Sequence, residues 1–161
     1  MGLAVVDIRP FTVLKDFKDH PAGRERWSNE IRAYTEIPWA TPELKWSNEY
    51  WLEVERLTPI TDLGPERSVK YREPLKTLLQ DVHNAGYWHR DVDLINVVVH
   101  PVRGPLLIDW EGICPATGEV SYDLYGARAA GVPSGHERKG PDGVWWGGGS
   151  TTTPKNYWAG L

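Results

Sequence analysis

The segment that decides the fold is residues 89–111, which carries two polar motifs separated by apolar runs. The motifs are His89-Arg90-Asp91-Val92-Asp93-Leu94-Ile95-Asn96 and Leu106-Leu107-Ile108-Asp109-Trp110-Glu111. Between them, residues 97–99 are three valines, and residues 100–105 are rich in turn-forming residues. Two short apolar runs joined by a turn segment predict a β-hairpin.

A hairpin of this length would bring three polar side chains to one end. Asn96 comes just before the first strand and Asp109 just after the second. Asp91, on the loop that leads to Asn96, would face the same cleft. Because Mg²⁺ binds a few carboxylate or amide oxygens together with phosphate oxygens, Asn96 and Asp109 are candidate metal ligands.

This pattern resembles the catalytic loop of protein kinases, H-R-D-x-x-x-x-N, followed by the metal-binding aspartate of that family. Asp109-Trp110-Glu111 is more similar to the I-D-W-E of the aminoglycoside and choline phosphotransferase branch, and residues 118–124 resemble the G-x-x-x-Y-D-L of that branch. The resemblance implies an ATP site. Asp91 would then accept or orient the proton of an attacking hydroxyl, while Asn96 and Asp109 would hold Mg²⁺ against the phosphates.

The composition is that of an ordinary globular protein. The chain has 161 residues, of which 40% are hydrophobic and 25% charged, and this predicts one domain with a real core. A net charge of −4 argues against a nucleic-acid binder. The single cysteine, Cys114, excludes an internal disulfide and fits a reducing compartment. With no signal pattern and no membrane-spanning apolar run, we expect an intracellular protein without a membrane partner.

The first part of the chain predicts a small sheet with one helix. Residues 3–8 and 11–15 read as strands broken at Arg9-Pro10, and residues 24–37 have the apolar spacing of a helix. Lys15 ends the second strand, where the resemblance implies the lysine that contacts the α- and β-phosphates of ATP. The resemblance also implies a glutamate from the helix to pair with it. Three glutamates compete for that role, and Glu30 fits the family pattern best.

Two further strands, around residues 44–46 and 49–57, are expected before a connection to the second half. Val54 to Leu57 resemble the kinase hinge, whose backbone groups bind adenine. The resemblance implies that Glu55 and Leu57 contact the nucleotide, with Leu57 as the backbone donor. An edge strand with outward-facing glutamates is the other interpretation, because recognition by backbone atoms leaves no signature in the side chains.

The second half predicts a long helix and the approach to the catalytic loop. Residues 61–65 read as a break, and a helical apolar stripe begins at Glu66 or Arg67, with Pro74 as an irregularity that could mark the true start. Gly86 is a candidate helix C-cap. His89 is expected to brace the loop backbone rather than to act as a catalyst.

Several features depart from the family. Only fourteen residues precede Lys15, too few for two strands and a Gly-rich loop over the phosphates, and Asp93 stands where relatives often carry a cation. Only 52 residues follow Asp109, too few for a full set of C-terminal helices. Residues 131–161 are rich in glycine and read as loop or disorder, although their aromatic residues could anchor them on an apolar surface.

We therefore expect an α+β, kinase-like two-lobe fold with both lobes reduced: an antiparallel sheet with one helix, then a shortened, mainly helical C-terminal lobe. Residues 1–57 would form the first lobe and hinge, 58–130 the C-terminal core and 131–161 the tail. The predicted function is transfer of the γ-phosphoryl group of ATP to a protein or small-molecule hydroxyl. A pseudokinase or partner-binding module, and an unrelated α+β domain, are the alternatives.

Overall fold

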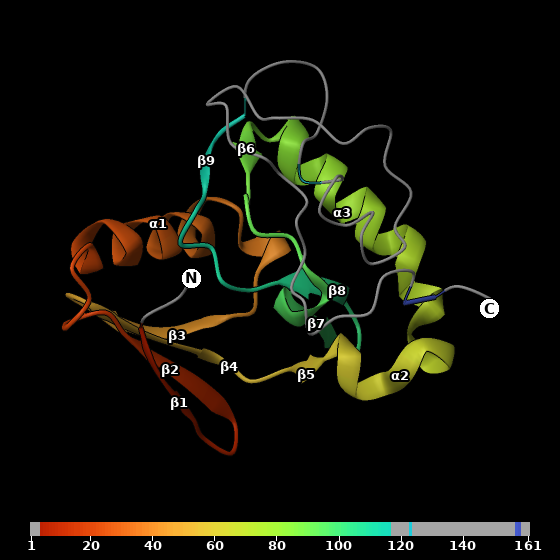
Figure 1. Ribbon diagram of the computed structural model, residues 1–161, viewed down its shortest axis with the longest axis horizontal. Coiled ribbons are helices and arrows are strands. Elements are labelled where there is room, and N and C mark those ends of the chain that lie inside the picture. The colour runs from red at the N-terminus through yellow and green to blue at the C-terminus, as the bar shows by residue number, and fades with distance from the viewer. Residues whose placement is uncertain (1–3, 117–122, 124–156, 159–161) are drawn as a thin grey trace.

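The computed structural model describes residues 4–116, 123 and 157–158 (Figure 1). Its strands are β1 (Val5–Ile8), β2 (Thr12–Asp16), β3 (Leu44–Asn48), β4 (Trp51–Glu55), β5 (Thr58–Pro59), β6 (Tyr87–Trp88), β7 (Val97–His100), β8 (Gly104–Leu107) and β9 (Cys114–Pro115). Its α-helices are α1 (Gly23–Glu36), α2 (Ile60–Ser68) and α3 (Arg72–Asn84), and short 3₁₀ turns cover Pro38–Ala40, Val69–Tyr71 and Leu94–Asn96. The described chain is thus an α+β fold with antiparallel sheets, as predicted.

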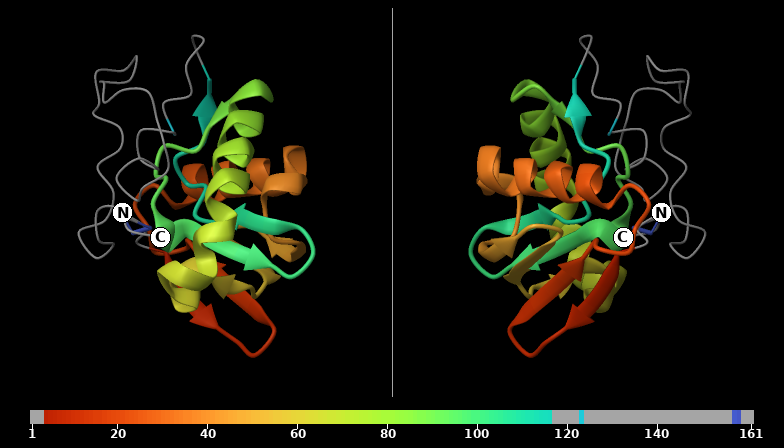
Figure 2. Two further views of the ribbon diagram at one scale, coloured as in Figure 1. Left: turned by 90° about the vertical axis from the view of Figure 1, so that its right-hand side faces the viewer. Right: turned by 90° about the vertical axis from the view of Figure 1, so that its left-hand side faces the viewer.

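The first part of the molecule is a four-stranded antiparallel sheet in the order β1-β2-β4-β3, with α1 lying along one face (Figure 1). The two predicted N-terminal strands and the predicted helix are therefore confirmed. Leu52 and Val54 alternate inward along β4 and join Ala33 and Tyr34 of α1 in the core. Strand β1 is exposed along its length, and its hairpin with β2 projects from one end of the molecule (Figure 2).

The strand predicted over residues 49–57 is shorter than expected. Tyr50 has a left-handed backbone (φ 70°) in the turn between β3 and β4, so β4 begins only at Trp51. After Glu55 the chain leaves the sheet and continues into β5, which pairs with β7 in the second part of the molecule. Residues 55–59 are therefore the covalent connection between the two parts.

The break predicted over residues 61–65 is wrong, because the structure interrupts the helix only at Gly64. Helix α2 begins at Ile60, which is fully buried, and continues to Ser68 across a kink at Gly64 (φ 76°, ψ 163°). A buried apolar residue anchors the first turn, so only the glycine interrupts the helix. The long helix predicted from residue 66 is likewise divided, because a 3₁₀ turn precedes α3 and Pro74 lies in the first turn of α3, where proline is tolerated.

The predicted hairpin is confirmed. β7 and β8 pair antiparallel, with Val97 opposite Leu107 and His100 opposite Gly104, and β5 completes a three-stranded sheet. Its apolar residues pack against α3. Gly86 follows α3 with φ 97°, which fits the predicted C-cap.

Most of the tail predicted over residues 131–161 lies outside the described residues. Tyr157 and Trp158 are described, and both lie against α2 and the turn that follows it. The Trp158 indole is 2% exposed and donates to Ser68 Oγ at 2.8 Å, while the Tyr157 hydroxyl donates to the Thr61 carbonyl at 3.5 Å. These two residues of the predicted tail therefore contact α2, whereas Trp145 and Trp146 lie outside the described residues. No helix in the described part of the chain combines the length and the apolar run needed to cross a bilayer.

Candidate functional site

The hairpin brings Asn96 and the Asp109 segment together at one end. The Asn96 carbonyl accepts a 2.9 Å hydrogen bond from the Ile108 amide, one residue before Asp109. The Asn96 side-chain nitrogen donates to the Asp91 carbonyl at 2.8 Å and to its carboxylate at 3.3 Å. Both bonds use the amide nitrogen, so the amide oxygen is the atom that could bind a cation.

Lys15 lies at the centre of a group of carboxylates. Its ammonium group donates to Glu30, donates to Asp109 Oδ1 at 2.8 Å, and lies 3.2 Å from Glu111 Oε1. The Lys15 side chain is 15% exposed and Glu30 is fully buried. The structure therefore brings the predicted pair, Lys15 and Glu30, into contact and adds two carboxylates from the segment after β8.

These charges change the protonation behaviour of the cluster. Burial lowers the pKa of Lys15, but the three carboxylates outweigh burial and raise it above its ordinary value. Burial raises the pKa of Asp109, but the charge of Lys15 and its hydrogen bond outweigh burial and hold that pKa below its usual value. At neutral pH Lys15 is therefore charged and Asp109 is ionised, which is the state a cation-binding carboxylate needs.

The backbone is unusual at two places in the site. Arg90 and Asp109 both have left-handed conformations, with φ of 76° and 66°, although neither is glycine. Such conformations cost free energy and persist only where surrounding contacts enforce them. Asp109 lies directly between β8 and the turn that carries Glu111, so its conformation sets the direction in which the chain leaves the hairpin.

His89 braces this part of the chain, as predicted. Its Nδ1 accepts from the Asp91 amide at 3.1 Å, so its Nε2 carries the proton and donates to the Ile108 carbonyl at 2.8 Å. The ring also packs edge-on against the fully buried Trp110, with centroids 4.5 Å apart. His89 thus ties the Asp91 loop to the end of β8.

Asp123 is a site residue that the sequence prediction did not select. Its carboxylate accepts from the His89 amide at 2.6 Å and from the Arg90 amide at 2.9 Å, and burial raises its pKa. It supports the backbone just before Asp91. The sequence signal for it is the Tyr-Asp-Leu of residues 122–124, which belongs to the family resemblance.

A cavity of about 490 Å³ lies between the first sheet and the hairpin. Valines of β1, β2, β4 and β7 give it apolar walls, and Lys15, Asn96 and Asp109 lie at its polar side. The predicted hinge residues Glu55 and Leu57 also line it. The Arg56 amide between them donates to the Phe11 carbonyl at 2.9 Å, which fixes the hinge backbone to the sheet.

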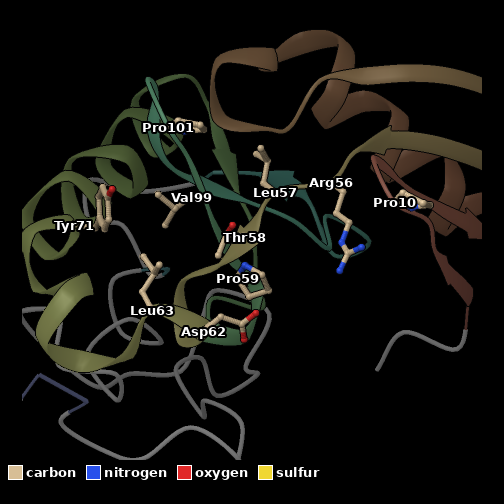
Figure 3. A pocket seen from close by; sticks show the side chains of 10 residues that line it. All are labelled: Pro10, Arg56, Leu57, Thr58, Pro59, Asp62, Leu63, Tyr71, Val99 and Pro101. Atoms are coloured by element: carbon tan, nitrogen blue, oxygen red, sulfur yellow. The ribbon is translucent and has the colours of Figure 1, made fainter.

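A second cavity, of about 540 Å³, adjoins the first along the hinge (Figure 3). Arg56, Leu57 and Pro59 are among the residues that line both cavities. Figure 3 places Pro10 on the sheet side of this second cavity and Tyr71 on the helical side. Lys15, Asn96 and Asp109 do not line it.

A third cavity, of about 530 Å³, lies on the other side of Asp109 and is bounded by α1 and residues 112–115. Asp91 lines this cavity and not the 490 Å³ cavity, whereas Asp109 lines both. Glu30 lines neither, because it is fully buried beneath Lys15. Asp91 therefore shares a cavity with Asp109 but not with Asn96 or Lys15, contrary to the expectation that Asp91, Asn96 and Asp109 face one cleft.

The oxygen ligands near Asp109 fit a hard divalent cation. The Asn96 amide and the Asp109 carboxylate line the same cavity, and both are of the oxygen type that Mg²⁺ prefers. Glu30, Asp109 and Glu111 also offer carboxylate oxygens within 4.8 Å of one another, but Lys15 already lies among them and provides the balancing charge. Asn96 and Asp109 are therefore the better candidates.

The fold resembles solved structures of WbdD. A structure of this protein, described as a bifunctional kinase-methyltransferase, has a TM-score of 0.53 and 21% identity, with 80% of the present chain and 34% of that chain covered. A second WbdD structure has a TM-score of 0.51 and 21% identity, and the match covers 71% of the present chain and 27% of that chain. The present chain thus spans about a third of the first structure's chain and about a quarter of the second's. The sequence matches no protein-family model and no curated protein.

Proposed function

We propose that this chain is an ATP-dependent phosphotransferase with a reduced kinase-like fold. The observation that carries this proposal is the position of Lys15, which contacts Glu30 and Asp109 and lines the same cavity as the hinge residues Glu55 and Leu57. The cavity is of a size that takes a small-molecule ligand. The fold resemblance to a protein described as a kinase-methyltransferase supports the same reading.

Each residue then has a defined part in ATP binding. The apolar walls and the hinge backbone take the adenine, and Lys15 binds the α- and β-phosphates while Glu30 fixes its direction. Asn96 and Asp109 hold Mg²⁺, which when bound neutralises phosphate charge. Because Asp109 is ionised at neutral pH, it binds a cation without first losing a proton.

Phosphoryl transfer would take place beside Asp91. The acceptor hydroxyl enters from the third cavity, where Asp91 and Asp109 both line the wall. Its oxygen forms a bond to the γ-phosphorus as the bond from that phosphorus to the bridging oxygen of ADP breaks, and Asp91 accepts the hydroxyl proton. Asn96 orients the Asp91 carboxylate through its 3.3 Å hydrogen bond. This is catalysis by positioning and charge neutralisation.

A nucleotide-binding module without transfer activity is the second candidate. Asp93, where relatives often carry a cation, is 3% exposed, and its carboxylate accepts from the Ile95 amide at 3.3 Å at the start of a 3₁₀ turn. The side chain at this position therefore supplies negative charge and a helix cap. A site with less positive charge near the γ-phosphate favours binding over transfer.

The decisive test is thermal unfolding with and without ATP, in Mg²⁺ and in chelator. ATP at ten times its dissociation constant would stabilise the folded protein by about 1.4 kcal/mol. We expect a Mg²⁺-dependent rise in melting temperature that is lost in Asp109→Asn and kept in Asp81→Asn, a change on the exposed face of α3. The absence of a shift under every condition would overturn the ATP-binding proposal.

Asp91→Asn separates the two candidates. If the chain is a phosphotransferase, this variant keeps the Mg²⁺-ATP shift but loses about 10²–10⁴-fold in ATP turnover, the usual contribution of a general base. Turnover to ADP with water as the acceptor is the readout. Binding without measurable turnover in the wild type would instead support the nucleotide-binding module.

A further inference from the structure

Glu111, two residues after Asp109, contacts both β2 and α1. Its side chain is 5% exposed and lies between two cations: Oε1 is 3.2 Å from Lys15 Nζ, and Oε2 accepts from Arg26 at 3.1 Å. Its main-chain carbonyl accepts from the Asn29 side chain at 2.8 Å. One residue thus connects the segment after β8 to the strand lysine and to two positions on α1.

Of the α1 residues bound by Glu111, Arg26 shares a helix face with Glu30, and Asn29 directly precedes Glu30 in the chain. Arg26 and Glu30 are four residues apart, and Asn29 is three residues after Arg26, which places them on neighbouring turns. The N-cap residue of α1 is Ala22, so the first turn of the helix receives no hydrogen bond from a capping side chain. The ties to Glu111 therefore hold the part of the helix that presents Glu30 to Lys15.

We propose that Glu111 is a positioning residue for the ATP site, which holds α1 against the Asp109 segment through Arg26 and Asn29 and so keeps Glu30 on Lys15. This inference rests on the proposed ATP-binding function. Lys15 shares its charge among three carboxylates. If Asp109 held a cation, Glu30 and Glu111 would still contact Lys15 and would keep the lysine in place beside the phosphates.

The test combines two substitutions that break the same ion pair from opposite sides. Glu111→Gln removes the carboxylate but keeps a side chain of similar size, and Arg26→Gln removes its partner on α1. Each is expected to raise the dissociation constant for Mg²⁺-ATP about tenfold, measured well below the melting temperature. If Glu111 acts through Arg26, the double variant also binds Mg²⁺-ATP about tenfold more weakly, whereas if the two residues acted independently its affinity would fall about a hundredfold.

Amide hydrogen exchange of residues 23–36 in the nucleotide-free protein supplies a second readout. Both single variants are expected to exchange faster in α1 than the wild type, because the ties to the helix are broken. Arg24→Gln, an exposed neighbour of Arg26, and Glu73→Gln, an exposed glutamate on α3, are the matched controls and should change neither readout.

Unchanged Mg²⁺-ATP affinity in both variants would overturn the positioning role, even if their melting temperatures fell, since a purely structural residue lowers stability without altering the affinity of the folded protein. A hundredfold loss in the double variant would overturn action through Arg26. A wild type that binds no Mg²⁺-ATP would overturn the proposed function itself, and α1 exchange would then show whether Glu111 still ties the helix.

Discussion

Lys15 is the residue on which the charge balance of the site depends. It is the cation that Glu30, Asp109 and Glu111 share, and all three carboxylate side chains are buried or mostly buried. Removing one partner of a buried ionic group leaves the others uncompensated, which costs more than the pair itself contributes. The effect of a substitution at Lys15 is therefore a measure of the whole cluster.

We predict that Lys15→Met lowers the free energy of unfolding by about 3–5 kcal/mol at neutral pH. Lys15→Arg keeps the charge and should restore most of the stability, while still weakening ATP binding because the guanidinium group has a different shape. Urea unfolding measures the stability, with Lys18→Met as an exposed control. Equal stability of Lys15→Met and the wild type would contradict the charge cluster.

The contact between Lys15 and Asp109 should make the stability of the protein depend on pH. Lys15 holds the pKa of Asp109 below its ordinary value, so Asp109 contributes stability above its unfolded pKa of about 3.9, and this contribution is lost as pH falls through the folded pKa. Lys15→Met lacks the contribution. The stability difference between the two proteins should be full above pH 5 or so and should shrink below about pH 4. A constant difference across that range would contradict this assignment.

The placement of α1 relative to β2 depends on a close backbone approach. After β2 the chain makes a turn in which the His20 amide donates to the Phe17 carbonyl at 3.1 Å. Helix α1 then begins at Gly23. A Cβ at Gly23 would overlap the carbonyl oxygen of Phe17. Because Phe17 is fully buried and its oxygen belongs to the backbone, the helix would have to move.

We predict that Gly23→Ala destabilises the fold by about 1–3 kcal/mol, the usual cost of an overpacked site. Displacement of α1 should also loosen the contact between Glu30 and Lys15 and weaken Mg²⁺-ATP binding. Chemical unfolding and nucleotide titration measure the two effects, with Arg24→Ala, at the exposed next position of α1, as the control. A fully stable Gly23→Ala protein would show that α1 tolerates a shift.

The two parts of the molecule are joined by a contact outside the proposed ATP site as well as by the hinge. Arg103, in the turn between β7 and β8, donates to the main-chain carbonyls of Pro38 and Thr41 at 2.8 and 2.9 Å. It also lies 3.9 Å from Glu55 at the end of β4. A single side chain of the second part thus holds the segment that follows α1 and the strand that enters the hinge.

We predict that Arg103→Ala lowers the free energy of unfolding by about 1–2 kcal/mol. This is less than the contribution of two fully buried hydrogen bonds to a charged group, because the Arg103 side chain is partly exposed. The dissociation constant for Mg²⁺-ATP should rise with it, since the cavity lies between the parts that Arg103 joins. Arg67→Ala, at an exposed position on α2, is the control for loss of an arginine. Unaltered stability and affinity would mean that the hinge alone sets the arrangement.

Local sequence was sufficient to predict the elements and the residues nearest each other along the chain. The β7–β8 hairpin follows from its apolar runs and turn, and it alone brings Asn96 to the Asp109 segment. The helix that carries Glu30 follows from its apolar spacing. The helix break was placed poorly because the burial of Ile60, which anchors the first turn of α2, is not visible in the local pattern.

Only the tertiary structure determined which distant groups meet. Glu111 reaches α1, Arg103 reaches the segment after α1, and Asp123 supports the backbone before Asp91, each across at least 30 residues of chain. Periodicity and turn chemistry describe neighbours a few residues apart, whereas these contacts arise when separate elements pack and buried polar groups must find partners. The sequence by itself determined most of the elements and the hairpin that brings Asn96 to the Asp109 segment, and packing determined how the charges of distant residues are shared.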